Sequence, residues 1–124
     1  MPGRVLIVDD HEVVRLGIRM VLTSDSPLEV CGEARDGLDA LRKVLELHPD
    51  VVILDLTMPG MNGFETAAQM RLIAPSVKII FYSIHEIPAT ARISGGDAFV
   101  SKSSSRQELT ATVDRVLRAD QFTH

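Results

Sequence analysis

The chain of 124 residues has only one cysteine, Cys31, and no long apolar run. A disulfide-stapled secreted domain is therefore excluded, because such frameworks need paired cysteines. No stretch approaches the roughly 20 apolar residues that cross a bilayer. The first apolar run stops at Asp9, too early for the core of a secretory signal peptide. We expect a cytoplasmic protein with no membrane contact, in which Cys31 is a small apolar residue in or near a strand.

Positive charge is also scarce. The sequence has 13 Lys and Arg against 17 Asp and Glu, a formal net charge of −4, and its basic residues are scattered. Phosphate contacts need clustered Lys and Arg, so nucleic-acid binding by this segment alone is disfavoured. With 45% hydrophobic and 24% charged residues, the composition is that of an ordinary globular protein. The length suits a single domain.

Five short apolar runs alternate with longer stretches of helical period. The runs are Val5–Val8, Leu28–Cys31, Val51–Leu54, Val77–Tyr82 and Ala98–Val100. Nearly continuous β-branched residues are typical of strands buried on both faces of a parallel sheet. The alternation therefore predicts a doubly wound α/β domain with five parallel strands and five helices.

The stretches between the runs show where the helices should lie. Their periodic apolar residues are Val14, Ile18 and Leu22, then Leu38, Leu41 and Leu45, then Phe64, Ala67, Ala68 and Leu72, and last Leu109, Val113, Val116 and Leu117. His48-Pro49 and Ala74-Pro75 are expected to end the second and third helices. The serines at 103–105 offer N-caps to the last helix, with Glu108 in its first turn.

Polar side chains stand at the carboxyl ends of four predicted strands, where ligands of such sheets bind. They are Asp9 and Asp10 after the first run, Asp55 after the third, Ser83 after the fourth and Lys102 after the fifth. A single aspartate in such a place is most often a turn former or a helix cap. Four strand ends together predict a crevice that holds three carboxylates, a hydroxyl and an ammonium group.

This combination of groups suits phosphoryl transfer. Clustered carboxylates repel unless a cation offsets them, and an oxygen-only donor set suits Mg²⁺. A metal ion and an ammonium group around one carboxylate supply the charge neutralisation on which phosphoryl transfer depends. Asp55 is then the candidate nucleophile, which would form an aspartyl phosphate. The hydroxyl of Ser83 could donate a hydrogen bond to a phosphoryl oxygen.

The segments "VDD", "VILDLTMPGMNGFE", "YS" and "SK" occur in the order found in response-regulator receiver domains of two-component signalling. The chain resembles that family over roughly residues 4–118, and "VDDHEVVRLGI" is most similar to the NarL/FixJ (LuxR-type) transcriptional regulators. The resemblance implies a flavodoxin-like sheet of order 2-1-3-4-5. It also implies a phosphorylation-dependent switch rather than an enzyme, whose only chemistry is self-phosphorylation and autodephosphorylation. A sensor histidine kinase would be its partner, and homodimerisation would follow phosphorylation.

The same resemblance assigns roles at the metal site. It implies that Asp55 accepts the phosphoryl group and also ligates Mg²⁺, together with Asp10 and the backbone carbonyl of Thr57. Of the adjacent pair, Asp10 is expected to touch the metal directly and Asp9 to act through water.

Four further residues receive roles from the resemblance. Lys102 would bind the phosphate and Ser83 would be the switch hydroxyl. Phe99 is either strand core or the aromatic residue that rotates on the output face. His85 is either a solvated loop side chain or a group that orients or screens an attacking water.

The chain departs from the family pattern between Ser83 and Lys102. They are 19 positions apart, about one helical turn fewer than is usual in receivers. Pro88, early in that stretch, and Gly95-Gly96 at its end are poor helix formers. The fourth helix is therefore expected to be short, displaced or partly disordered.

Three alternatives to the receiver interpretation were weighed. A phosphohydrolase of the haloacid-dehalogenase type would need a second Asp two residues after the nucleophile, where Thr57 stands. A dinucleotide-binding domain would need a glycine-rich loop after the first strand, where the sequence reads Asp-Asp-His. A phosphorylation-independent interaction module stays open, because a short fourth helix would be unusual in a switch.

The predicted receiver occupies residues 1–120, and residues 121–124 are a C-terminal tail or the start of a linker. LuxR-type regulators carry a helix-turn-helix domain, but no basic recognition helix occurs in this chain. Control of transcription, and DNA binding with it, is therefore expected to depend on a domain outside this chain.

Overall fold

A computed structural model describes residues 3–24, 28–83, 96–103 and 105–121. Five parallel strands form one sheet in the order β2-β1-β3-β4-β5. The strands are β1 (Arg4–Val8), β2 (Glu29–Ala34), β3 (Val51–Leu54), β4 (Lys78–Ser83) and β5 (Ala98–Ser101). The predicted strands and their order are confirmed.

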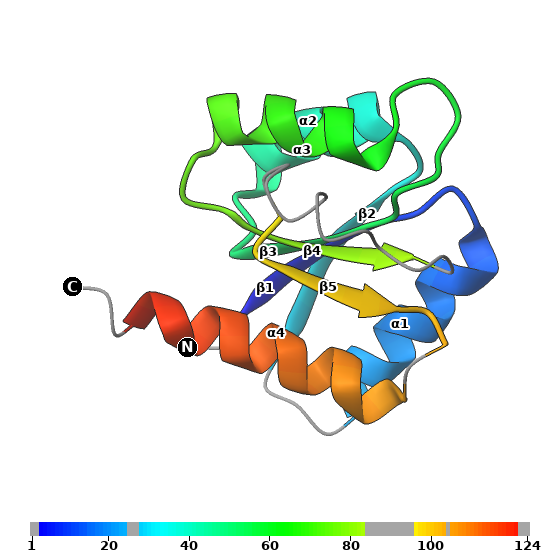
Figure 1. Cartoon of the computed structure of the whole chain (residues 1–124), viewed down its shortest axis with the longest axis vertical. Coiled ribbons are helices and arrows are strands. Elements are labelled where there is room, and N and C mark those ends of the chain that lie inside the picture. Colours follow the sequence, from blue (N-terminus) through cyan, green and yellow to red (C-terminus); the bar gives the residue numbers. More distant parts are fainter. Residues whose placement is uncertain (1–2, 25–27, 84–95, 104, 122–124) are drawn as a thin grey trace.

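The described residues form four helices: α1 (Glu12–Ser24), α2 (Gly37–Leu47), α3 (Gly63–Ile73) and α4 (Arg106–Gln121). α2 and α3 cover one face of the sheet, and α1 and α4 cover the other (Figure 1). These four coincide with four of the five predicted helices. The shortened helix expected between β4 and β5 falls on residues 84–95, which lie outside the described part of the chain.

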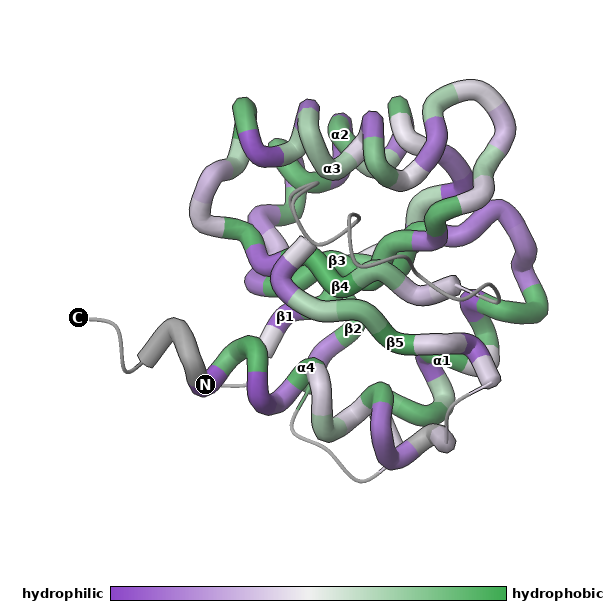
Figure 2. Tube along the Cα trace, viewed as in Figure 1, coloured by the Kyte–Doolittle hydropathy of each residue, from purple (hydrophilic) through white to green (hydrophobic). Residues whose placement is uncertain are grey.

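The core consists of two apolar layers, one on each side of the sheet. Along β1, Leu6 and Val8 face the layer under α2 and α3, whereas Val5 and Ile7 face the layer under α1 and α4. All four side chains are fully or almost fully buried. Hydrophobic segments accordingly gather in the central strands (Figure 2). Burial on both faces explains the continuous apolar runs, because each alternate side chain needs an apolar neighbour.

Capping interactions fix ends of three helices. The amide of Glu65 donates to the side chain of Asn62, and Glu65 accepts from the Asn62 amide in return, which forms a capping box at the start of α3. The C-cap of α2 is His48, in the left-handed conformation with φ 51°, and the C-cap of α3 is Ala74. The Glu108 amide donates to Ser105 Oγ at the start of α4. The predicted helix stops and the serine cap are confirmed.

The predicted apolar faces of α2 and α3 are partly wrong. Leu38, Leu45 and Leu72 are exposed, whereas Ala40 and Val44 supply the buried surface of α2. α2 packs against both β2 and α3, and its side with small residues allows this close approach. The leucines share the same helical period, so their spacing alone could not distinguish the two faces. No helix in the described ranges is both long enough and apolar enough to cross a membrane.

Candidate functional site

The polar residues predicted to share a crevice do converge at the carboxyl edge of the sheet. Val8 of β1 is paired with Leu54 of β3, and the amide of Asp55 donates to the Val8 carbonyl over 2.9 Å. Asp9 and Asp55 therefore leave neighbouring strands side by side. On the other flank, the Lys102 amide donates to the carbonyl of Ser83, the last residue of β4, over 2.7 Å.

Lys102 links the carboxylates of the first and third strands. Its Nζ lies 2.7 Å from Asp9 Oδ2 and 3.5 Å from Asp55 Oδ1, and 5.8 Å from the centre of the Tyr82 ring. Burial alone would lower the pKa of Lys102, but the hydrogen bond and charge of Asp9, together with Asp55, outweigh burial and raise it. Lys102 is thus a fixed cation between two buried carboxylates.

The Lys102 cation does not fully offset the cost of ionising the buried Asp55 carboxyl group. The side chain of Asp55 is buried, with 5% of the residue exposed. Burial and the charge of Asp9 raise the pKa of Asp55, and the opposing effects of Lys102 and of the Thr57 amide, 3.3 Å from Asp55 Oδ1, are smaller. The ionised carboxylate would therefore gain from one more positive charge.

Asp55→Asn is expected to raise the free energy of unfolding at neutral pH in EDTA. The folded-state pKa of Asp55 lies above its unfolded value of about 3.9, so the stability that its protonated form contributes is complete below the unfolded value. That contribution is lost as the pH rises through the folded value. The advantage of the Asn variant should therefore shrink as the pH is lowered towards about 4. Urea denaturation across this range measures the difference, and an advantage independent of pH would contradict the assignment.

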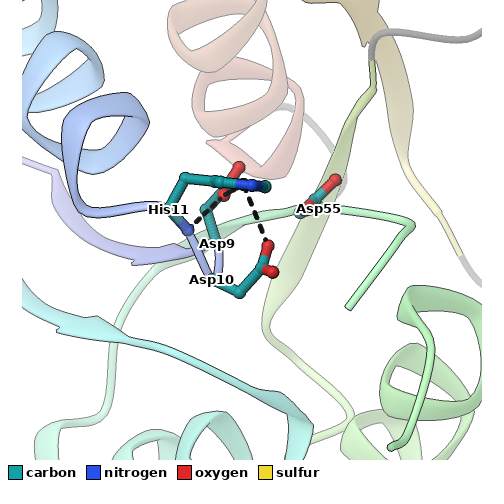
Figure 3. Close-up of side chains that lie close together, drawn as sticks. All are labelled: Asp9, Asp10, His11 and Asp55. Atoms are coloured by element: carbon teal, nitrogen blue, oxygen red, sulfur yellow. Dashed lines mark hydrogen bonds and ion pairs between the residues drawn. The ribbon is translucent and has the colours of Figure 1, made fainter. Parts of the chain in front are cut away.

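His11 completes the cluster from the end of the loop that precedes α1. Its amide donates to Asp9 Oδ1 over 2.9 Å, and its Nδ1 lies 3.2 Å from Asp9 Oδ1 and 3.1 Å from Asp10 Oδ1 (Figure 3). One possible ligand atom from each of Asp9, Asp10, His11 and Asp55 lies within 4.8 Å of the others. His11 is not among the predicted site residues, although its position directly after the acidic pair is a usable signal.

The donor atoms fit a hard divalent cation. Asp10 Oδ1 is buried and accepts no hydrogen bond from the described residues, although His11 Nδ1 lies 3.1 Å from it. A buried acceptor without a partner is costly, and an oxygen ligand to Mg²⁺ would satisfy it. The three carboxylates also outnumber the single ammonium group of Lys102.

The remaining predicted residues lie in different environments. Ser83 is buried, and Thr57 is exposed beside Asp55. Phe99 is half-buried and stacks on Phe81, its partner in the sheet, with ring centroids 5.4 Å apart. That contact shows core packing for Phe99 and leaves its rotation as a prediction. His85 lies outside the described residues.

Comparison with known proteins defines the class. Residues 5–114 match the response regulator receiver domain family, and the chain belongs to this family. Receiver domains are signalling modules of two-component systems, and they bind Mg²⁺ at an acidic pocket.

Individual relatives narrow the similarity to LuxR-type and NarL-type regulators. The response regulator VraR of Staphylococcus saprophyticus is 36% identical over 116 residues, which cover 91% of this chain and 56% of the relative. A LuxR-family response regulator from Aurantimonas sp. superposes with a TM-score of 0.91 at 32% identity, over 96% of this chain and 87% of the other. The receiver domain of NarL from Mycobacterium tuberculosis superposes with a TM-score of 0.88 at 34% identity, over 94% of this chain and 97% of the other. The predicted NarL/FixJ resemblance is confirmed, and the chain spans little more than half of VraR.

Proposed function

We propose that this chain is a phosphorylation-controlled switch in which Asp55 accepts a phosphoryl group from a sensor histidine kinase. The observation that carries the proposal is the buried Asp55 carboxylate, which lies beside the Asp9-Asp10 pair and shares the Lys102 ammonium group with Asp9. In the transfer, an Asp55 carboxylate oxygen forms a bond to phosphorus while the bond from phosphorus to the kinase histidine nitrogen breaks.

The residues around Asp55 divide the remaining work. Lys102 Nζ lies 3.5 Å from Asp55 and would meet a phosphoryl oxygen. Ser83 ends β4, the strand next to β3, and its hydroxyl would donate a hydrogen bond to another phosphoryl oxygen. Bound Mg²⁺ would neutralise the charge that gathers on the phosphoryl oxygens. These positions support the predicted phosphate-binding and switch roles.

Contacts of the acidic pair support the predicted division of the metal ligands. The carboxylate of Asp9 already accepts hydrogen bonds from Lys102 and from the His11 amide, which suits a role through water. Asp10 Oδ1 is without a hydrogen bond from the described residues, which suits direct ligation beside Asp55 and the carbonyl of Thr57.

The output of the switch follows from the relatives. We propose that residues 1–120 form the receiver and that residues 121–124 begin a tail or linker. Phosphorylation would promote a homodimer and control transcription through a DNA-binding domain outside this chain. The kinase would be a sensor histidine kinase, the kind of partner that response regulators have.

The test is incubation with Mg²⁺ and acetyl phosphate, followed by intact-mass measurement. The expected result is the gain of one phosphoryl group by the parent chain, and loss of that gain in Asp55→Asn or in EDTA. Asp114→Asn is the matched control, because Asp114 is an exposed carboxylate on α4 that pairs with Arg118. An adduct that still forms in Asp55→Asn would refute the assignment of Asp55 as the phosphoacceptor. Absence of an adduct in the parent chain would favour the phosphorylation-independent interaction module.

A further inference from the structure

Arg15, in the first turns of α1, connects the acidic pair to strand β2. Its Nε donates to Glu33 Oε1 over 2.9 Å, and its Nη1 donates to the backbone carbonyl of Asp9 over 2.7 Å. The side chain is largely buried, with 11% exposed. A guanidinium group is a rigid planar fork of donors, so this one side chain fixes the Asp9 carbonyl relative to Glu33.

The Asp9 carbonyl matters because it sets the direction of Asp10. That carbonyl and the Asp10 amide belong to one planar peptide unit. The amide of Asp9 is already held by the Ala34 carbonyl over 3.1 Å, so with Arg15 both sides of Asp9 are tied to β2. Asp10 Oδ1 has no hydrogen bond from the described chain. Besides the ion-pair contact with His11, the backbone anchor at Asp9 is therefore the described contact that orients Asp10.

Glu33 is the fixed point of this arrangement. Its second carboxylate oxygen accepts from Arg19, over 2.8 Å from Nε and 2.7 Å from Nη2. Burial would raise the pKa of Glu33, but the hydrogen bonds and charges of Arg19 and Arg15 outweigh it and lower the pKa. Glu33 thus stays ionised and keeps hold of both arginines.

We propose that Arg15 is a positioning residue that sets the Mg²⁺ affinity of the site by orienting the Asp9–Asp10 peptide. The inference rests on the proposed metal site. Arg15 would act without contact with either the metal or the phosphoryl group. Arg19 offers a matched control, because it shares α1 and the Glu33 carboxylate with Arg15 but makes no contact with Asp9 among the described hydrogen bonds.

Charge and position predict opposite results when Arg15 is replaced. Removal of a nearby positive charge favours a bound cation, so a purely electrostatic role predicts tighter Mg²⁺ binding in Arg15→Gln. A positioning role predicts weaker binding, because the Asp9–Asp10 peptide is then free to turn. Loss of a group that orients a metal ligand typically lowers metal affinity by about 10-fold or more.

The experiment is a Mg²⁺ titration of the unphosphorylated chain, in which amide chemical shifts in NMR spectra report binding. Arg15→Gln is expected to raise the Kd by about tenfold, whereas Arg19→Gln should stay within about twofold of the parent chain, because exposed ion pairs contribute little. Arg15→Lys keeps the charge but loses the fork, so we expect a smaller rise in the same direction. Thermal unfolding in EDTA identifies any variant that fails to fold, and Arg15→Lys then carries the test.

The outcomes separate this inference from the proposed function. An unchanged or lower Kd in the Arg15 variants, or an equal rise in Arg19→Gln, would overturn the positioning role while the metal site stands. A parent chain without saturable shifts would overturn the metal site and the inference with it.

Discussion

Lys102→Met is expected to lower the free energy of unfolding in EDTA by about 2–3 kcal/mol and to abolish the phosphoryl adduct. The substitution leaves Asp9, with 1% exposed, and Asp55, with 5% exposed, without their shared cation. Removal of one partner from a fully buried ion pair costs about 3–5 kcal/mol, and the partial exposure of Lys102 brings the expected loss to the lower limit of that range or just below it. Phosphoryl transfer should fail because the charge on the incoming group is no longer offset.

A distinguishing sign is the response of this variant to Mg²⁺. A ligand that binds only the folded state adds stability according to its affinity, and the carboxylates left by Lys102→Met attract a cation more strongly than before. Mg²⁺ should therefore stabilise the variant by more than it stabilises the parent chain, as measured by urea denaturation with and without the ion. Equal increments in the two proteins would contradict the shared-cation interpretation.

Arg118→Met is the control for Lys102→Met. It removes the cation of an exposed ion pair with Asp114 on α4. Such a pair is typically worth less than about 1 kcal/mol. We expect little change in unfolding, no change in the Mg²⁺ increment and normal adduct formation. The contrast separates loss of a site cation from loss of any cation.

The sequence predicted the convergence of the site because that convergence depends on strand order alone. Asp9, Asp55 and Lys102 each follow an apolar run, and parallel strands bring their carboxyl ends to one edge. The same reasoning could not choose the buried face of α2, because Leu38 and Val44 both fit a helical period and the choice depends on packing against β2 and α3.

The contacts of Glu33 that support the site could not be predicted from the sequence for a similar reason. Glu33 lies in the stretch "CGEA", which offers no motif. Its importance arises from two contacts with α1 residues 14 and 18 positions earlier in the chain. Such contacts depend on how α1 lies across β2, and side-chain periodicity gives no information on that placement.

Gly63→Ala is expected to destabilise the fold by about 2–3 kcal/mol and to slow phosphorylation. A Cβ at Gly63 would lie 2.5 Å from the Asp55 carbonyl oxygen and 2.7 Å from Leu56 Cα. Both are backbone atoms, so no rotamer change can relieve the overlap, and overpacking of this kind costs about 1–3 kcal/mol. The start of α3 must then move relative to Asp55 and Leu56, even though the Gly63 amide donates to the Leu56 carbonyl over 3.0 Å.

Gly17→Ala tests whether this loss is specific to the position. Gly17 lies inside α1, and nothing stands within 4 Å of the Cβ it would gain. Alanine is favoured over glycine in a helix interior by about 1 kcal/mol, so this variant should be more stable than the parent chain. Opposite signs in urea denaturation are the expected result. A neutral or stabilising effect of Gly63→Ala, together with an adduct rate equal to that of the parent chain, would contradict this prediction. The start of α3 would then not be a rigid support for Asp55.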